Sequence, residues 1–198
     1  MRVNVCVVGT KGTGFTYIAH DLCLILSSMG YKVVGRLQPQ ADGSVGRKWI
    51  PPPYLGRGDE DYSIATTERT EVADLVIVLS SMGNPAGLVR DARRGGVIVA
   101  DTSHPNVRYW LEEMMAEAWK RGVRLVDVDS VKLLRDAGLP ATMRNMFILG
   151  VALPILNPLI SEHTVRGALR RAYAEEVENI LPVIEAGMRY GRRLKVTL

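Results

Sequence analysis

A glycine-rich segment near the start of the chain has the residue types of an anion-binding loop. It reads Gly9-Thr10-Lys11-Gly12-Thr13-Gly14 and stands between an apolar run typical of a buried strand and a helical pattern. Free backbone N–H groups, the helix dipole and the Lys11 ammonium would all favour a phosphate there. A plain tight turn between strand and helix explains the glycines equally well. Both interpretations stay open, and Lys11 decides between them.

The spacing of these glycines does not match the dinucleotide-binding fingerprint. The position that must be glycine for close contact with a pyrophosphate is Lys11, and the segment is not a P-loop either. The second predicted strand ends without the acidic residue that holds a ribose hydroxyl, and Arg36 stands near that place instead. Arg36 therefore joins the loop residues as a candidate phosphate ligand, whereas the pattern argues against an NAD site.

Polar residues also follow two later predicted strands, at the ends where open α/β sheets bind their ligands. They form the runs Ser80-Ser81-Met82-Gly83-Asn84 and Asp101-Thr102-Ser103-His104. His104 is too close in sequence to Asp101 and Ser103 to establish a nucleophile-and-base geometry, and the chain has no nucleophile elbow. We therefore assign no catalytic residue to this chain.

The elements that must position these residues alternate along the chain, as in a doubly wound α/β domain. The predicted strands are Arg2 to Val8, Tyr31 to Gly35, Asp74 to Ser80, Gly96 to Asp101 and Val123 to Val128. The predicted helices are Phe15 to Met29, Pro85 to Arg93, Val107 to Arg121 and a short one from its Asp129 cap to Leu134. The first two strands are expected to be parallel and joined by a right-handed crossover.

Residues 36–61 interrupt this alternation. They contain four glycines and the run Pro51-Pro52-Pro53, which disfavour a regular helix or a central strand. A segment of this length without regular structure is commonly an interaction segment. We therefore predict a long loop that forms a contact surface, followed by a short strand at Tyr62 to Thr66.

The C-terminal part of the chain is helical in pattern. The apolar run from Met146 to Ile160 is too short to span a bilayer and contains Pro154, so it predicts a buried, kinked helix. A further helix, capped by Ser161, is expected to reach about Gly191 and to bend or split at Pro182.

Composition is consistent with one folded domain. The chain has 198 residues, 47% of them hydrophobic, which is enough for one sizeable core. We predict a three-layer, doubly wound, mostly parallel α/β domain over residues 1–198, with a sheet core at 1–140 and a helical tail at 141–198. The net charge of +4 is spread along the chain, which disfavours a nucleic-acid partner and fits an acidic protein or a phosphorylated ligand.

The cysteines and the N-terminus limit which cofactors the chain could ligate and where in the cell it is expected. Only Cys6 and Cys23 are present, so neither a metal-ligand spacing nor an iron–sulfur motif is available, and both are expected to be small buried residues. The N-terminus lacks the regions of a signal peptide, so we expect a cytoplasmic protein without a membrane segment. The chain has more Arg than Lys, and it has few Asn and Gln residues. This composition favours a thermophilic source.

Several segments occur in an order that resembles a known family. They are the glycine loop, Gly95-Gly96-Val97-Ile98-Val99-Ala100-Asp101, Val126-Asp127-Val128-Asp129 with Ala137-Gly138-Leu139-Pro140, and Asn145-Met146-Phe147-Ile148-Leu149-Gly150. Together they resemble the gamma subunit, or the equivalent domain, of the pyruvate/2-oxoacid:ferredoxin oxidoreductases, including the small subunit of indolepyruvate oxidoreductases. The resemblance covers nearly the whole chain. Its most specific part is the Asn-Met-x-x-Leu-Gly element, followed by a helical tail that contains Glu178-Asn179 and ends near Gly187.

This resemblance implies a subunit without a complete active site. The family converts a 2-oxoacid, coenzyme A and oxidised ferredoxin to acyl-CoA, carbon dioxide and reduced ferredoxin. Thiamine diphosphate and iron–sulfur clusters are held by other subunits, so the implied partners are subunits of the alpha, beta and delta types and, indirectly, ferredoxin. The implied role of this chain is assembly, closure of a shared cavity and a contact to coenzyme A.

The sequence departs from the family pattern in two places. The family loop reads Gly-x-Gly-Gly-x-Gly, so Gly9, Gly12 and Gly14 match while Lys11 replaces a glycine. The Arg-Gly-Gly motif of the family has no counterpart in residues 36–61. Two other functions therefore stay open: a stand-alone NADP-dependent reductase that uses Lys11 and Arg36 for phosphates, and a nonenzymatic scaffold with the same fold.

Overall fold

The computed structural model describes residues 3–10, 13–32, 36–39, 46–50, 56–57, 72–80 and 86–198. Its strands are β1 (Val5–Thr10), β2 (Tyr31–Lys32), β3 (Arg36–Pro39), β4 (Gly46–Ile50), β5 (Gly56–Arg57), β6 (Ala73–Val78), β7 (Ala92–Asp101) and β8 (Arg124–Val128). Its helices are α1 (Phe15–Ser28), α2 (Ala86–Val89), α3 (Pro105–Tyr109), α4 (Leu111–Arg121), α5 (Ser130–Asp136), α6 (Arg144–Leu156), α7 (Glu162–Tyr173) and α8 (Val177–Arg193).

The main sheet has six strands in the order β3-β4-β1-β6-β7-β8. Strands β1, β6, β7 and β8 are parallel, whereas β4 runs antiparallel to β1 and pairs with β3 at the edge. All six residues of β6 are buried, as expected for a parallel strand covered by helices on both faces. The predicted α/β fold with a mostly parallel sheet is confirmed.

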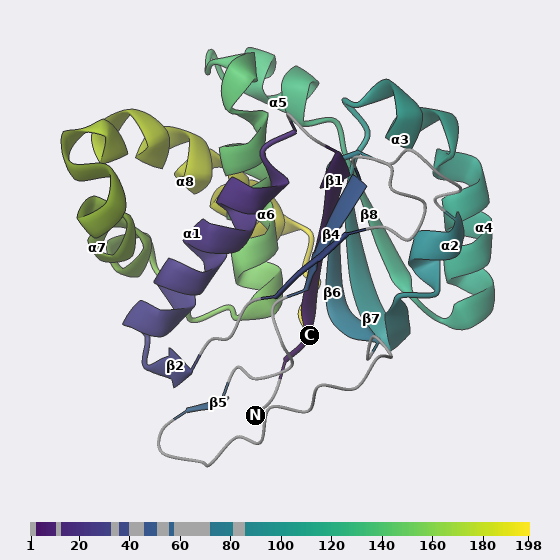
Figure 1. The fold of residues 1–198 in the computed structure, drawn as a ribbon. Coiled ribbons are helices and arrows are strands. Elements are labelled where there is room, and N and C mark those ends of the chain that lie inside the picture. The colour runs from purple at the N-terminus through teal and green to yellow at the C-terminus, as the bar shows by residue number, and fades with distance from the viewer. Residues whose placement is uncertain are drawn as a thin grey trace.

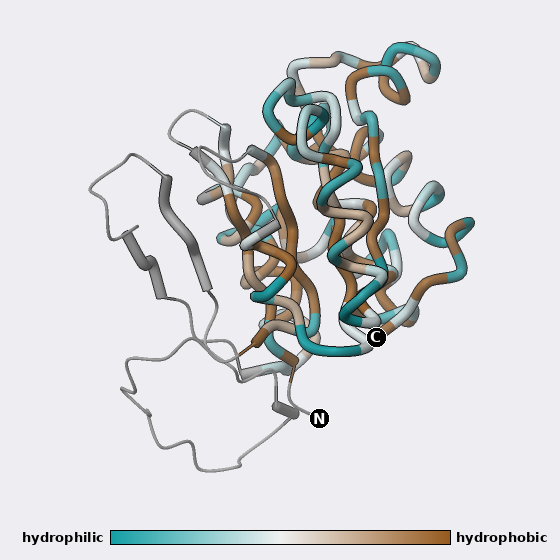
Figure 2. The backbone as a smooth tube through the Cα atoms, turned by 90° about the vertical axis from the view of Figure 1, so that its right-hand side faces the viewer, coloured by the Kyte–Doolittle hydropathy of each residue, from teal (hydrophilic) through white to brown (hydrophobic). Residues whose placement is uncertain are grey.

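Figure 1 shows three layers, with α1, α6, α7 and α8 on one face of the sheet and α2, α3 and α4 on the other. The side chains of β1 alternate between these faces, as strand geometry requires. Val5 and Val7 belong to the core cluster under the C-terminal helices, whereas Cys6 and Val8 belong to the cluster under α4. The long central strands are accordingly hydrophobic along most of their length (Figure 2).

The predicted pairing of the first two strands is wrong. β2 pairs antiparallel with β5 in a separate two-stranded sheet, and the neighbours of β1 are β4 and β6. An apolar run shows that a strand forms but not which strand it will pair with, because pairing depends on contacts far apart in sequence. Residues 33–35 of the predicted strand lie outside the described residues.

The prediction that residues 36–61 form a loop without a strand of the main sheet is also wrong. β3 and β4 form an antiparallel pair, and β4 pairs with β1 from Thr10↔Gly46 to Val7↔Trp49. Gly46 begins β4 and Pro39 ends the edge strand β3, positions at which glycine and proline are tolerated. The predicted strand at Tyr62 to Thr66 lies outside the described residues.

Three helix predictions need correction. The helix predicted at Pro85 to Arg93 is the short α2, because β7 already begins at Ala92, before a register shift in its pairing with β6. The helix predicted at Val107 to Arg121 is divided into α3 and α4 at Trp110. The last helix breaks at Ala174, which has a φ of 46° and separates α7 from α8.

Pro182, which was predicted to bend or split that helix, does not split it and lies inside α8. A proline near the start of a helix removes one backbone hydrogen bond, and the buried face of α8 holds the helix together across it. The predicted cap of the preceding helix is confirmed, because Ser161 accepts a hydrogen bond of 3.1 Å from the backbone N–H of Thr164.

The predicted buried helix is α6, in which every residue from Phe147 to Leu156 is buried and Pro154 lies within the helix. α6 crosses α8 at glycines. A Cβ atom on Gly150 would overlap the carbonyl oxygen of Ile184, and one on Gly187 would overlap that of Phe147 and lie 3.0 Å from the Gly150 Cα. The last glycines of the two resembling segments therefore face each other. Among the described residues no helix is long and apolar enough to cross a membrane.

Candidate functional site at the carboxyl ends of the parallel strands

The glycine loop packs closely on itself and on the start of α6. A Cβ atom on Gly9 would lie 2.6 Å from Thr13 Oγ1 and 2.8 Å from Phe15 Cβ, and Thr13 itself is buried. Gly14, with a φ of 74°, is the N-cap of α1, and a Cβ there would overlap the side-chain amide nitrogen of Asn145. The loop and the Asn-Met-x-x-Leu-Gly element therefore meet beyond the carboxyl end of β1. We call Gly9, Thr13, Gly14 and Asn145 the glycine corner.

Asn145 is a functional candidate that the sequence analysis identified only as part of a family motif, without assigning it a role at the site. Its side-chain oxygen Oδ1 is buried and has no hydrogen-bond partner among the described residues. Buried polar atoms are nearly always paired, so an unpaired acceptor marks a place where a bound ligand or water would complete the bonding. The signal in the sequence was a lone amide at the start of an otherwise apolar helix.

The structure brings together only some of the predicted phosphate ligands. Lys11, Gly12 and the side chain of Thr10 lie outside the described residues. Arg36 begins β3 and pairs with Ile50, while the adjacent Trp49 pairs with Val7 in the middle of β1. The backbone of Arg36 is therefore two strands away from β1 and level with its middle, away from the end where the loop begins.

The run that follows β7 forms a buried hydrogen-bond network. Asp101 is buried, and its Oδ1 accepts hydrogen bonds from the backbone N–H of Ser103 (3.1 Å), Ser103 Oγ (2.6 Å) and Ser130 Oγ (2.7 Å). Because Ser130 begins α5, this network ties the end of β7 to the turn after β8. A carboxylate with three donors is well satisfied, which is a structural role.

His104 is not placed as a general base in this network. Its Nδ1 accepts a hydrogen bond of 3.3 Å from the backbone N–H of Asn106 and so caps α3. Burial lowers its pKa, with a further contribution from the nearby Arg144 charge. Ser80, after β6, is buried, and residues 81–85 of the other predicted polar run lie outside the described residues.

A cleft of about 520 Å³ opens beside the Asp101 network. Its lining combines cations and carboxylates and consists of Ser103, Pro105, Arg108, Asp129, Val131, Lys132, Arg135 and Asp136. Arg108 is held by the carbonyl of Thr102 (2.9 Å) and by the Asp129 carboxylate, and Lys132 by Asp136 (2.8 Å), which raises the pKa of Lys132. Four of the five charged side chains in this lining are therefore paired with one another.

Cysteine and metal chemistry receive no support from the described residues. Cys6 is buried as predicted, whereas Cys23 is half-buried, and burial raises the pKa of its thiol to about 12. A thiol with such a pKa is almost entirely protonated near neutral pH and is a poor nucleophile. No group of three or more potential metal ligands occurs in the part of the chain that the structure describes.

Comparisons with known proteins match this chain to one family. The family model described as pyruvate ferredoxin/flavodoxin oxidoreductase matches residues 58–190, more than half of the chain. No curated protein matches the sequence. A gamma subunit of a keto/oxoacid ferredoxin oxidoreductase from Geobacter sulfurreducens has a similar structure, with 14% identity, a TM-score of 0.65 and coverage of 97% of this chain and 99% of that one.

Two further solved structures share the fold. A pyruvate oxidoreductase subunit from Thermotoga maritima is 15% identical, with a TM-score of 0.61 and coverage of 97% of this chain and 96% of that one. A 2-oxoglutarate:ferredoxin oxidoreductase from Magnetococcus marinus, with 2-oxoglutarate, coenzyme A and succinyl-CoA bound, is 16% identical with a TM-score of 0.66. The match covers 98% of this chain but 31% of that chain. The family predicted from the motifs is confirmed.

Proposed function

Because the chain belongs to the pyruvate ferredoxin/flavodoxin oxidoreductase family, we propose that it is the gamma-type subunit of a 2-oxoacid:ferredoxin oxidoreductase complex. The observation that carries this proposal is the near-complete overlap of its fold with a separate gamma subunit, over 97% of this chain and 99% of that one. We assign the thiamine diphosphate and iron–sulfur centres of the reaction to partners, because an iron–sulfur cluster typically takes four cysteine ligands and this chain has only Cys6 and Cys23. Subunits of the alpha, beta and delta types would hold them, and ferredoxin would be reduced there, in the cytoplasm.

The chain's own polar residues support a subunit that is not catalytic by itself. Asp101 accepts three hydrogen bonds, and the His104 ring caps a helix, so neither is free to activate a nucleophile. The hydrogen bonds of Asp101 and His104 hold the loops that follow β7 and β8 in place. This part of the chain would therefore provide a rigid wall for a cavity whose chemistry belongs to the partners.

We propose that the glycine corner contacts coenzyme A when the complex is assembled. Coenzyme A carries phosphates and amide N–H groups, and the corner together with the neighbouring Lys11 would offer one complement to each. Lys11 and the start of α1 would attract a phosphate. The buried, unpaired Asn145 Oδ1 would accept a hydrogen bond from an N–H or hydroxyl group. The coenzyme A bound in the Magnetococcus protein is consistent with this proposal.

The test is to purify the complex from the host through a tag on this chain. We expect it to reduce ferredoxin in a coenzyme A-dependent reaction, assayed with pyruvate, branched-chain, aryl and 2-oxoglutarate substrates. Lys11→Glu should raise the KM for coenzyme A by about tenfold or more, the order expected for loss of a charge-assisted contact. The KM for the 2-oxoacid and the yield of complex should not change.

Lys195→Glu is the matched control, because Lys195 is an exposed lysine near Thr197, which contacts Arg124 at the amino-terminal end of β8, whereas the glycine corner lies beyond the carboxyl end of β1. It should leave both KM values unchanged. Unchanged coenzyme A kinetics in Lys11→Glu would remove the loop contact while leaving the subunit role intact. Failure to recover any thiamine-dependent partner, or tight binding of NADPH to the isolated chain, would contradict the subunit role itself.

A further inference from the structure

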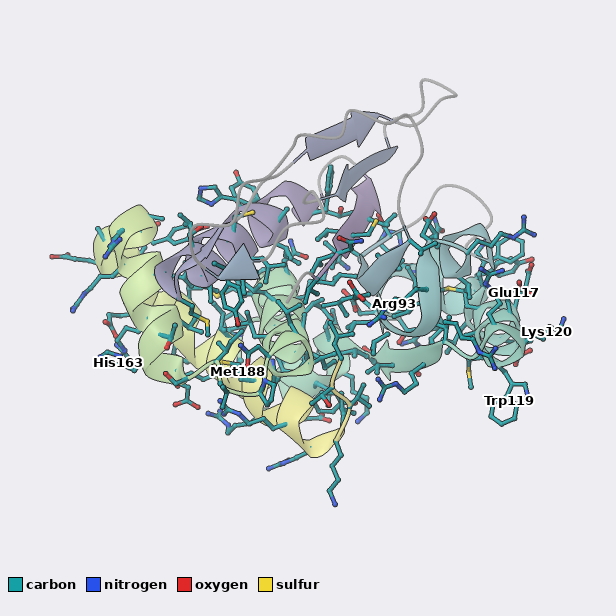
Figure 3. The ribbon with its side chains drawn as sticks, turned by 90° about the horizontal axis from the view of Figure 1, so that it is seen from below. Arg93, Glu117, Trp119, Lys120, His163 and Met188 are labelled. Atoms are coloured by element: carbon teal, nitrogen blue, oxygen red, sulfur yellow. The ribbon has the colours of Figure 1, made fainter. Side chains whose placement is uncertain are left out.

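α4 carries an unusually exposed aromatic residue. Trp119 is 87% exposed, more than any other large hydrophobic side chain among the described residues, and Met115, one turn earlier, is 53% exposed. Residues four positions apart lie on the same side of a helix, so the two form a continuous apolar strip. Figure 3 shows the Trp119 side chain extending away from the ribbon into solvent.

Cations surround the end of this strip. Lys120 and Arg121 occupy the last turn of α4, and the Arg94 side chain lies over the following residue, Gly122: a Cβ atom on Gly122 would be 3.5 Å from Arg94 Cγ. The backbone N–H of Gly95 donates to the Gly122 carbonyl at 2.8 Å, which fixes this approach. All three cations are exposed, and none has a carboxylate partner among the described residues. We call Arg94, Met115, Trp119, Lys120 and Arg121 the Trp119 surface.

Helix stability explains only some of the residues in the Trp119 surface. Lys120 and Arg121 are favoured at the C-terminal end of a helix by its dipole. The dipole gives no reason for Trp119, Met115 or Arg94. Trp, Met and Arg are the residue types enriched at protein–protein interfaces, and Trp and Arg dominate the positions that contribute most to binding.

From these observations we infer that the Trp119 surface docks onto an acidic patch of a partner polypeptide in the same complex. The indole would enter an apolar pocket, and the carboxylates around that pocket would pair with Arg94, Lys120 and Arg121. A symmetric dimer through this surface is disfavoured, because it would bring three like charges against their own copies. This inference rests on the proposed function, since it requires a complex.

The position of the surface leaves the candidate site open. Arg94 and Gly122 lie at the amino-terminal ends of the strand pair β7 and β8, whereas the glycine corner and the cleft lie beyond the carboxyl ends of the sheet (Figure 1). A partner docked at the Trp119 surface would hold the domain from the end opposite its candidate coenzyme A contact. Substrate access and assembly would then use separate faces.

The experiment measures the affinity between this chain and its partner polypeptides in the reconstituted complex, at low and high salt. Trp119→Ala should weaken binding by at least about tenfold, as expected for a central aromatic contact. Charge reversal in Arg94→Glu/Lys120→Glu/Arg121→Glu should weaken binding and reverse its dependence on salt, because attraction is replaced by repulsion. Trp119→Ala changes one exposed side chain and should leave the melting temperature of the isolated chain unchanged. The charge reversal puts acidic groups at the C-terminal end of α4 and should lower the melting temperature slightly, so for that variant the reversed salt dependence is the deciding readout.

Matched controls come from the opposite helical layer. Leu159→Ala removes a side chain that is 77% exposed, and Arg171→Glu/Arg189→Glu/Arg193→Glu reverses three exposed charges on α7 and α8. Neither should change affinity or its salt dependence.

Three outcomes would overturn the inference. If the wild-type complex forms and both Trp119-surface variants bind as tightly as wild type, the docking face is elsewhere and the subunit role stands. If no partner is recovered with the wild-type chain, both proposals fail. If sedimentation shows that the isolated chain self-associates and that Trp119→Ala abolishes this, the surface is a contact between copies of this chain.

Discussion

Glycine meets two different needs in the α6–α8 crossing and in the glycine corner. At the crossing, Gly150 and Gly187 have ordinary helical conformations, and what excludes a side chain is the backbone of the facing helix. In the corner, Gly14 has a φ of 74°, and the neighbour that a side chain would strike is the Asn145 amide. Both regions belong to the segments that resemble the family. Only the second contains a buried polar atom without a hydrogen-bond partner among the described residues, the Asn145 Oδ1.

The difference shows that a glycine in a family motif is not by itself a sign of a binding site. The crossing is surrounded by the main hydrophobic cluster, and its glycines let two buried helices approach to backbone contact. The corner instead contains two polar side chains, those of Thr13 and Asn145. We therefore expect substitutions at the crossing to lower stability, and substitutions in the corner to affect coenzyme A binding as well.

The largest effect is expected from Gly150→Ala. The new methyl group would overlap the Ile184 carbonyl oxygen, so α8 must move away from α6. Overpacking of this kind costs about 1–3 kcal/mol and sometimes more, and each kcal/mol lowers Tm by roughly 2–4 °C in a chain of this size. Thermal and urea unfolding of the isolated chain measure the change.

The control for that substitution is Gly167→Ala. Gly167 lies in α7, is exposed, and has nothing within 4 Å of the position of a Cβ atom. Because alanine is the better helix former, this variant should gain up to about 1 kcal/mol. Equal stability of the two variants would show that the helix crossing is not as close as the glycines indicate.

A smaller effect is expected from Gly14→Ala, with Gly30→Ala as its partner. Both glycines have positive φ, of 74° and 81°, so alanine is strained by about 1–2 kcal/mol at either position. Gly30 has nothing within 4 Å of a Cβ position, whereas Gly14 abuts Asn145. Gly14→Ala should therefore be the less stable variant and alone should raise the coenzyme A requirement of the complex.

Addition of Asn145→Ala separates strain from contact in the corner. If the extra loss in Gly14→Ala comes from the amide, the double variant Gly14→Ala/Asn145→Ala should recover it, with a coupling energy of about 0.5–3 kcal/mol. If the effects of the two substitutions on the unfolding free energy are additive, the glycine loop and the start of α6 are not energetically coupled.

The features that sequence predicted well are those set by local physics. A buried α6 follows from its continuous apolar run, and the caps Asp129 and Ser161 follow from side chains that accept a hydrogen bond from the N–H three residues on. The pairing of β4 with β1 did not follow, because an apolar run does not specify its partner strand. The position of the helix break at Ala174 was equally hidden, since no proline or glycine marks it.

The site was predicted less completely than the fold. The motif containing Asn145 was identified, but its position against Gly14 depends on how α6 packs beside α1, which no local pattern encodes. Arg36 was placed near the loop on the assumption of a simple βαβ unit. β3 lies beyond β4, so the backbone of Arg36 is two strands away from β1, a pairing that no local pattern encodes.

One buried contact ties α1, which begins at the corner, to the helical layer that contains the crossing. The Asp21 side chain is fully buried and accepts hydrogen bonds from the Tyr173 hydroxyl at 2.8 and 3.0 Å, and His20 Nδ1 lies 3.2 Å from Asp21 Oδ1. Burial raises the pKa of Asp21 above its ordinary value of 3.8, more than the bonds from Tyr173 and His20 lower it. Burial and the Asp21 contact also raise the pKa of Tyr173.

The smallest effect is a pH dependence of this contact. Folding raises the pKa of Asp21, so the protonated carboxyl stabilises the folded state. This stabilisation is fully present below pH 3.8 and is lost as pH rises through the raised pKa. The total loss is about 1.4 kcal/mol for each pH unit by which the folded pKa exceeds the unfolded pKa. Asp21→Asn keeps an acceptor for Tyr173 and cannot ionise, so wild type should lose unfolding free energy relative to this variant as pH rises toward neutral. Tyr173→Phe removes a bond that favours the carboxylate and should move this loss to higher pH. Urea unfolding over a pH series measures the unfolding free energy of all three proteins. If this free energy changes with pH in the same way for wild type and Asp21→Asn, the pKa of Asp21 is not raised, and the buried contact between α1 and α7 is not as described.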